Sequence, residues 1–478
     1  MRLPKVALVV GNGAYRHVSR LRNTVNDARS IGAALQESGF EVTLVADATR
    51  ADMLAAAQQH LRTLEARKCV GLVYFATHGL QLAWRNYLLP VDAAIARSED
   101  VPAQCLDLGT ITDGVKRAGN PMNVIILDAC RENPFAGEHK GLSQMDAPTG
   151  TLLAYATAPG HMADDGTGAN GLYTENLLRE MRVRDAKIED VFKRVRLAVR
   201  RASKGAQVPW ESTSLEEDFY FRPPEQLRKL SEEEGLRLFA EERALFERAR
   251  DAGEAALLEE YLQRYPSGRF CELAQLFLDR ALTARGERRV EAVSAAGNPH
   301  SSGSARADTE FKVGDRYSYR ISRPGSEPRD VNRRVTSITA TEVSFNQGRI
   351  VLDPLGNMIK TGDGRRFSPR QDIPFEYAVG KRWTARFELL EGGPGSVEAH
   401  FRITARERVT VPAGTFDCFR IEARSLNTHV FRPPVEAQST IWRAPQLVRL
   451  WVKFEEEWHQ RGSRIHSERH ELLSFQQS

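Results

Sequence analysis

Short hydrophobic runs alternate with helical patterns over residues 1–222. Residues 6–10, 70–76 and 124–127 are almost wholly apolar, which is typical of strands buried on both faces. Residues 21–38 lie between two such runs and place apolar side chains at the spacing of one helix face. Strands that alternate with helices predict an α/β domain whose mainly parallel sheet is covered by helices on both faces.

The pattern changes in the next part of the chain. Residues 223–285 are rich in Glu, Arg, Leu and Ala at helical spacing, with a break at residues 265–268. We therefore expect a helical spacer of two helices, similar to a tetratricopeptide-like pair. Residues 286–310 are rich in Ser, Gly, Ala and Arg and have no apolar period, which predicts a flexible linker.

Residues 311–478 carry short alternating runs separated by Gly and Pro, which predict an antiparallel all-β domain. The segment 411–418 resembles a hairpin of lipocalin-like or half-barrel domains. Trp442, Trp451 and Trp458 belong either to its core or to the lining of a ligand cavity, and the pattern alone leaves both interpretations open.

Composition and charge narrow the class of protein. With 478 residues, 41% of them hydrophobic and 27% charged, the chain is expected to be a soluble protein of two or three domains. The net charge of +4, from 67 basic and 63 acidic residues, is too even to indicate a nucleic-acid partner. No apolar run approaches the ~20 residues that span a bilayer, so no membrane span is predicted.

The start of the chain bears on its compartment. Residues 1–5 lead directly into the first predicted strand, without the longer apolar stretch and cleavage site of a signal peptide. The compartment is therefore not determined: a cytoplasmic location is the default expectation, and a start further upstream would allow a periplasmic one.

The cysteines are scattered and odd in number, which argues against a disulfide framework and implies at least one free thiol. They are Cys69, Cys105, Cys130, Cys271 and Cys418. No close pair and no complete calcium-loop pattern occurs, so we predict neither a metal site nor a cofactor.

Two polar residues directly follow apolar strands. His78 comes after the run 70–76, and Cys130 comes after the run 124–127. In an open α/β sheet the functional cleft lies outside the carboxyl ends of the strands, so both side chains are expected at the same edge.

This pairing has a chemical reason. A thiol attacks a carbonyl as thiolate, and a neighbouring imidazole can take its proton and later protonate the departing amine. Gly79 leaves room for a substrate backbone, and the N–H groups of Gly79 and Cys130 are candidates for an oxyanion hole. A lone Cys is usually a small buried hydrophobe and a lone His a structural hydrogen bonder. Together at matching strand ends, the two favour catalysis.

These segments resemble the caspase family. The resemblance rests on His-Gly after a strand, on residues 124–134 (VIILDACRENP) about fifty positions later, and on the three further matches 7–15 (ALVVGNGAY), 21–28 (LRNTVNDA) and 155–160 (YATAPG). Asp128, where caspases have Gln, is closer to the bacterial metacaspase-like (orthocaspase) branch. Thr77 departs from the small residue usual before His-Gly, and Arg131 begins a departure after the cysteine.

The resemblance implies a cysteine endopeptidase with a His78–Cys130 dyad, a thioester acyl-enzyme and cleavage after Arg or Lys. It maps an acidic specificity pocket to Asp27 and Asp128, and substrate binding to Ala156 and Ala158. The alternative for the two carboxylates is a capping residue and a strand-end hydrogen bonder. Protein or peptide substrates are the expected partners.

A rival interpretation makes the caspase-like domain a non-catalytic scaffold or signalling protein. The helical spacer or the β domain would then bind a partner or a ligand. The presence of both His78 and Cys130 favours the peptidase, because a decayed site commonly loses one of them.

Overall fold

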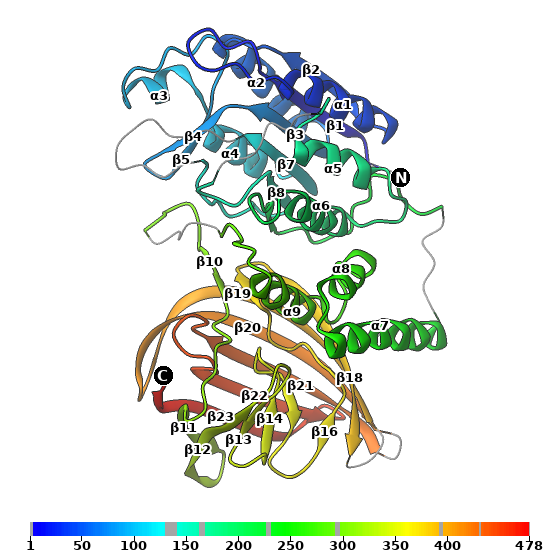
Figure 1. Cartoon of the computed structure of the whole chain (residues 1–478), viewed down its shortest axis with the longest axis vertical. Helices are drawn as coiled ribbons and strands as arrows, with labels where there is room; N and C mark the ends of the chain where they lie inside the picture. The colour runs from blue at the N-terminus through cyan, green and yellow to red at the C-terminus, as the bar shows by residue number, and fades with distance from the viewer. Residues whose placement is uncertain are drawn as a thin grey trace. The chain divides into compact units, whose positions relative to one another are not determined.

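The structure is a computed structural model that describes residues 3–129, 141–161, 168–225, 231–291, 297–391, 395–429 and 432–477 (Figure 1). The chain forms two compact units. The first comprises Met1–Lys229 and Thr283–Gly303, and the second comprises Leu230–Leu282 and Ser304–Ser478. Each unit is described by itself.

A six-stranded sheet forms the centre of the first unit, in the order β2-β1-β3-β7-β8-β9. Its strands are β2 (Glu41–Ala46), β1 (Lys5–Gly11), β3 (Val70–Thr77), β7 (Met122–Ala129), β8 (Thr151–Tyr155) and β9 (Trp210–Thr213). All neighbours pair in parallel except β8 and β9, which are antiparallel. The expected mainly parallel sheet is therefore confirmed.

Helices cover both faces of this sheet (Figure 1). Tyr74 and Ile126 belong to the hydrophobic cluster on one face, with α1 (Thr24–Glu37), α5 (Leu172–Met181) and α6 (Ile188–Ala202). Phe75 and Leu127 belong to the cluster on the other face, with α2 (Arg50–Ala66) and α4 (Leu108–Ala118). Successive strand residues point to opposite faces, so burial on both faces explains why these strands are continuously apolar.

A small antiparallel sheet continues from the end of β3. It consists of β4 (Gly79–Leu82), β5 (Arg85–Leu88) and β6 (Leu106–Asp107), and α3 (Asp100–Gln104) precedes β6. The position of β4 matters for the site, since only His78 separates it from β3.

The helical part of the second unit contains α7 (Glu232–Ala252), α8 (Ala255–Arg264) and α9 (Cys271–Ala284). The sequence indicated a single helix before the break at 265–268, and this was wrong. Gly253 ends α7 in the left-handed conformation, with φ of 64°, which is the usual stop signal of a helix. Among the described residues, none of these or the other helices combines the length and hydrophobicity needed to span a membrane.

A closed antiparallel barrel fills the rest of the second unit. Within the described residues its twelve strands are β11 (Arg316–Arg323), β12 (Ser326–Ile338), β13 (Val343–Phe345), β14 (Ile350–Leu352), β15 (Met358–Lys360), β16 (Arg366–Phe367), β18 (Arg382–Glu391), β19 (Gly395–Val411), β20 (Gly414–His429), β21 (Arg432–Arg443), β22 (Lys453–Gln460) and β23 (Ser463–Gln476). The first and last strands, β11 and β23, pair and close it. The all-β expectation is confirmed, and the barrel is closed, which the half-barrel alternative to a lipocalin-like domain did not anticipate. Beside it, β10 (Ser304–Arg306) pairs with β17 (Glu376–Ala378).

Residues 286–291 and 297–303 of the expected linker belong to the first unit, and some of them make specific contacts there. Glu287, which is half-buried, forms an ion pair at 2.7 Å with the buried Arg200 of α6. Asn298 donates to the carbonyl of Gln144, and Asp146 accepts from the backbone of Ser302. Composition could not reveal these contacts, because each depends on a partner more than 80 positions away.

Candidate active site

The two candidate reacting residues follow neighbouring strands. In the parallel pair β3–β7, Thr77 lies opposite Ala129. His78 is the next residue after Thr77, and Cys130 is the next after Ala129. Cys130 itself lies outside the described residues. The register therefore brings the two chain positions that lead to His78 and Cys130 side by side at one edge of the sheet.

The imidazole of His78 is held in one orientation. The side chain is buried, and its Nε2 lies 2.8 Å from the carbonyl oxygen of Ser19. A carbonyl only accepts hydrogen bonds, so Nε2 must carry a proton. In the neutral ring Nδ1 is then the basic nitrogen. The Tyr15 ring packs at 4.6 Å between centroids, and its hydroxyl accepts from the backbone N–H of His78 at 2.7 Å.

Gly79 lies in a crowded part of the site. A Cβ added there would come within 3.0 Å of Leu142 Cδ2 and 3.4 Å of Ala129 Cβ. The glycine thus lets β4 approach the end of β7 and the segment that contains Leu142. Leu142 and Ala129 therefore occupy the space beside Gly79 that we expected to be free for a substrate backbone.

Asp128 points toward the start of α5. Its Oδ2 accepts from the Thr174 hydroxyl at 2.7 Å and from the Tyr74 hydroxyl at 3.4 Å. The side chain is half-buried. Thr174 and Tyr74 thus orient the carboxylate of Asp128, two residues before the candidate nucleophile.

Asp27 reaches the same helix from α1. It is 2% exposed, and its Oδ1 accepts from the Asn170 side chain at 2.7 Å and from the backbone N–H of Gly171 at 3.0 Å. Gly171 is the N-cap residue of α5, so Asp27 supplies the negative charge that a helix N-terminus favours. It caps a neighbouring helix and not its own.

Both carboxylates affect the pKa of the buried Tyr74. Burial raises the pKa of Tyr74 well above its usual value, and the negative charges of Asp128 and Asp27 raise it further. Both carboxylates therefore act on one buried hydroxyl, which lies 2.6 Å from that of Thr174. The structure brings Asp27 and Asp128 together around the first turn of α5.

Ala156 and Ala158 follow β8 and are both buried. The N–H of Ala156 donates to Leu127 of β7 at 2.9 Å, and its carbonyl accepts from the Gln207 side chain. The carbonyl of Ala158 accepts from the N–H of His161. These bonds fix the backbone after β8, and a role of the two alanines in substrate binding remains a prediction.

The described cysteines differ from an activated thiol. Burial raises the pKa of Cys69, and it raises that of Cys418 to about 12. A raised pKa leaves less thiolate, which is the nucleophilic form. Cys105 is also buried, and Cys271 is half-buried.

Sequence reasoning missed the groups that position the site. Ser19 acts through its backbone carbonyl, which every residue possesses, so no residue type could mark it. Tyr15 carried a signal, since it ends the segment 7–15 that supports the family resemblance. Thr174 and Asn170 gave none, because their partners lie 46 and 143 positions away.

Residues of the first unit are similar to known proteins. Residues 4–220 match the family model of the caspase domain. Over 189 residues the chain is 30% identical to human "Mucosa-associated lymphoid tissue lymphoma translocation protein 1" and 29% identical to its mouse homolog. Each match covers 38% of this chain but only 22% of the relative. The family model therefore identifies residues 4–220 as a caspase-like domain.

Proposed function

We propose that the protein is a cysteine endopeptidase in which Cys130 is the nucleophile and His78 the general base and acid. The observation that carries the proposal is the pairing of Thr77 with Ala129, each the residue before a member of the dyad. The Ser19 carbonyl supports it further, because it keeps the proton on Nε2 and leaves Nδ1 as the base.

The reaction follows from these roles. Nδ1 of His78 takes the thiol proton, and the thiolate of Cys130 attacks the scissile carbonyl. The N–H groups of Gly79 and Cys130 bind the oxyanion, an interaction worth roughly 3–4 kcal/mol per donor in other enzymes. The intermediate collapses to a thioester as the protonated His78 gives its proton to the leaving amine. A water molecule, deprotonated by His78, then hydrolyses the thioester and restores the thiol.

Specificity for Arg or Lys before the scissile bond is the second part of the proposal. Asp27 and Asp128 both accept hydrogen bonds from residues at the start of α5. Asp128 lies two residues before Cys130 in the chain. Two carboxylates beside the nucleophile suit a guanidinium or ammonium group. In this proposal Ala156 and Ala158 form a wall of the pocket, and Asp128 supports a relationship to the metacaspase branch.

A positional library of fluorogenic peptides tests both parts. We expect the full-length protein to cleave after Arg and Lys, and the Cys130→Ala variant to be inactive. Preference for Asp would contradict the acidic pocket. Equal turnover by wild type and Cys130→Ala would contradict Cys130 as the nucleophile, and the absence of turnover by the wild type would favour the scaffold interpretation.

A further inference from the structure

A buried arginine of the barrel lacks most of the partners that such a group requires. Arg333 of β12 lies opposite Tyr317 of β11, so both side chains face the barrel core. Arg333 is only 9% exposed. Within the described ranges, its Nε and Nη1 atoms have no hydrogen-bond partner, and no carboxylate pairs with it. Arginine stays protonated in proteins, and burial of an unpaired ion costs several kcal/mol.

Aromatic stacking satisfies only the flat faces of this guanidinium. Its central carbon lies 4.6 Å from the centre of the Trp451 ring and 5.7 Å from that of Tyr319. Such contacts use the face of the cation. The N–H groups project from its edge, where the geometry matches a carboxylate.

A second buried arginine increases the positive charge of this core. Arg443 of β21 is 1% exposed, and its Nε donates to the Tyr377 hydroxyl, whereas its Nη1 has no partner among the residues described. Burial raises the pKa of Tyr319, and the charges of Arg333 and Arg443 oppose that rise. Both cations therefore lie near Tyr319.

The barrel interior opens toward one end. Along β23 the inward-facing positions change from Leu472, which is fully buried, through His470 to the partly exposed Glu468. Along β12 they change in the same direction, from the fully buried Val335 through Arg333 to the partly exposed Val331. Arg333 thus lies at the boundary between the sealed core and the open part of the lumen.

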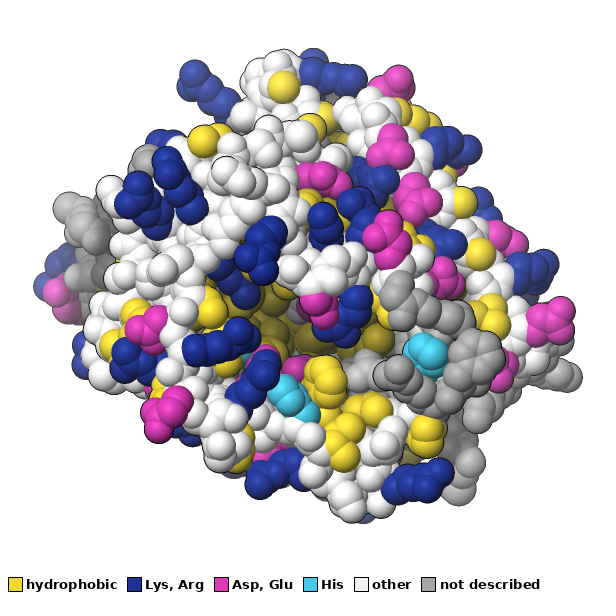
Figure 2. Space-filling view, turned by 90° about the horizontal axis from the view of Figure 1, so that it is seen from below, with side chains coloured by type: hydrophobic (Ala, Val, Ile, Leu, Met, Phe, Trp, Pro, Cys, Tyr) yellow, Lys and Arg dark blue, Asp and Glu magenta, His cyan; other side chains and the backbone are white. Residues whose placement is uncertain are grey.

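Figure 2 shows the barrel from its open side. The surface is hollowed there, with hydrophobic side chains on the floor of the hollow and Lys and Arg side chains gathered around the opening. A few acidic and histidine side chains lie among them. An apolar cavity with a positive rim attracts an anion that has a hydrophobic body.

The acidic groups of the lumen already have partners. Glu468 accepts from His470 at 2.9 Å and from Arg323 at 2.9 Å. Glu456 accepts from the Ser439 hydroxyl at 3.0 Å. These two glutamates therefore belong to a local network, and neither one pairs with Arg333.

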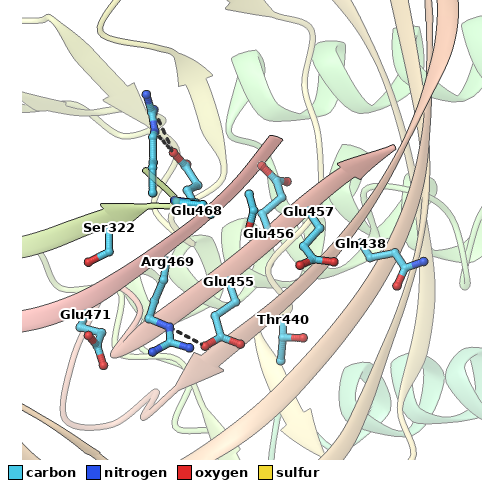
Figure 3. Close-up of a pocket in the computed structure, with 12 residues that line it drawn as sticks. Ser322, Gln438, Thr440, Glu455, Glu456, Glu457, Glu468, Arg469 and Glu471 are labelled. Atoms are coloured by element: carbon cyan, nitrogen blue, oxygen red, sulfur yellow. Dashed lines mark hydrogen bonds and ion pairs between the residues drawn. The ribbon is translucent and has the colours of Figure 1, made fainter. Parts of the chain in front are cut away.

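The outer face of the same strands carries an acidic groove of about 530 Å³. Figure 3 shows Glu455 and Arg469 on this side of the sheet and Glu456 and Glu468 on the other. Glu455 pairs with Arg469 at 2.9 Å. Within this groove Glu455 thus has a cationic partner, whereas the buried Arg333 has no carboxylate partner among the described residues.

We propose that the barrel lumen binds an organic carboxylate with a hydrophobic body, whose carboxylate pairs with Arg333. The aromatic wall of Tyr319, Trp451 and Phe454 would contact the apolar part of the ligand. The proposal concerns the barrel alone and does not depend on the peptidase activity.

Isothermal titration of the full-length protein with dodecanoate and with 1-dodecanol tests this site. The two probes share the alkyl chain and differ in the charge. We expect dodecanoate to bind about ten- to a hundredfold more tightly, which is the contribution of one or two charge-assisted hydrogen bonds. Equal affinities, or no binding of dodecanoate, would overturn the proposal, and this comparison needs no variant.

Variants locate the carboxylate. Arg333→Gln should reduce the affinity for dodecanoate to that for dodecanol and leave dodecanol binding unchanged. Arg334→Gln is the matched control, because Arg334 is the next residue of β12 and points outward into solvent. If both variants bind dodecanoate as the wild type does, Arg333 is not the binding group. Circular dichroism confirms that each variant is folded.

Discussion

Two buried charged residues, one in each unit of the molecule, differ in how many hydrogen-bond partners they have. Asp27 of the first unit is 2% exposed, and Asn170 and Gly171 both donate to it. Arg333 of the second unit is 9% exposed, yet its Nε and Nη1 have no hydrogen-bond partner in the described part of the chain. The comparison teaches that groups within the protein can stabilise a buried charge, as they do for Asp27, whereas the N–H groups of Arg333 that have no partner favour a group from outside.

The largest expected effect concerns the buried His78 of the first unit, whose partners orient it for chemistry. His78→Ala should lower kcat on arginyl peptides by about three orders of magnitude, because the general base and acid are lost. Fluorogenic peptide kinetics measure this. The control is His400→Ala in the barrel, where the side chain is largely exposed and activity should be unchanged.

The second effect tests the ion pair between the buried Arg200 and the half-buried Glu287. Glu287→Ala should lower the free energy of unfolding by about 3 kcal/mol, since it leaves the buried Arg200 without its carboxylate. Urea titration of the full chain measures the loss. Glu41→Ala is the control, because its ion pair with Arg67 is exposed and should contribute little. Equal losses in the two variants would contradict the described packing of residue 287.

Acid should destabilise the first unit before the second. Burial lowers the pKa of His60 to about 4, from 6.5 in the unfolded chain. The unfolded state therefore binds more protons, and stability falls by up to about 3 kcal/mol as the pH drops from 6.5 to 4.

In the barrel, the hydrogen bond from His470 and the charge of Arg323 lower the pKa of Glu468 to about 2, from 4.5. Its contribution is complete above pH 4.5 and is lost only as the pH falls toward 2. The free energy of unfolding of the first unit, measured at a series of pH values, should fall between pH 6.5 and 4 in the wild type. In His60→Phe it should change little over the same range. A slope that persists in His60→Phe would contradict this assignment.

The smallest expected effect concerns Asp128 in the proposed pocket. Asp128→Asn should lower kcat/KM on arginyl peptides by one to two orders of magnitude, because a charge-assisted hydrogen bond contributes roughly 1.5–3 kcal/mol. The rate at which Cys130 reacts with small thiol reagents should change little in this variant, since His78 is unchanged. Matched Arg and Lys peptides measure the loss. An undiminished rate would leave Asp128 as a strand-end hydrogen bonder of Thr174 and Tyr74.

Local patterns predicted much of the fold and part of the site. Burial on both faces makes β3 and β7 continuously apolar, so the strands and the residues after them were evident from hydrophobicity alone. Gly253 was a helix stop that could have been found, because a glycine in a helical pattern is a common C-cap.

Long-range pairing could not be predicted in the same way. Closure of the barrel depends on β11 and β23, which lie about 150 residues apart in the chain and whose pairing leaves no local mark. The carbonyl of Ser19 is likewise invisible in a sequence. Arg333 looks like any strand-face charge until the barrel buries it.

Mass spectrometry after treatment with an arginyl chloromethylketone tests the central claim most directly. The account predicts modification of Cys130 alone in the full-length wild type, at a rate that falls sharply in His78→Ala. The buried thiols Cys69 and Cys418, whose pKa values are raised, should stay unmodified. Labelling of either one in place of Cys130, or an equal rate in His78→Ala, would contradict the His78–Cys130 dyad.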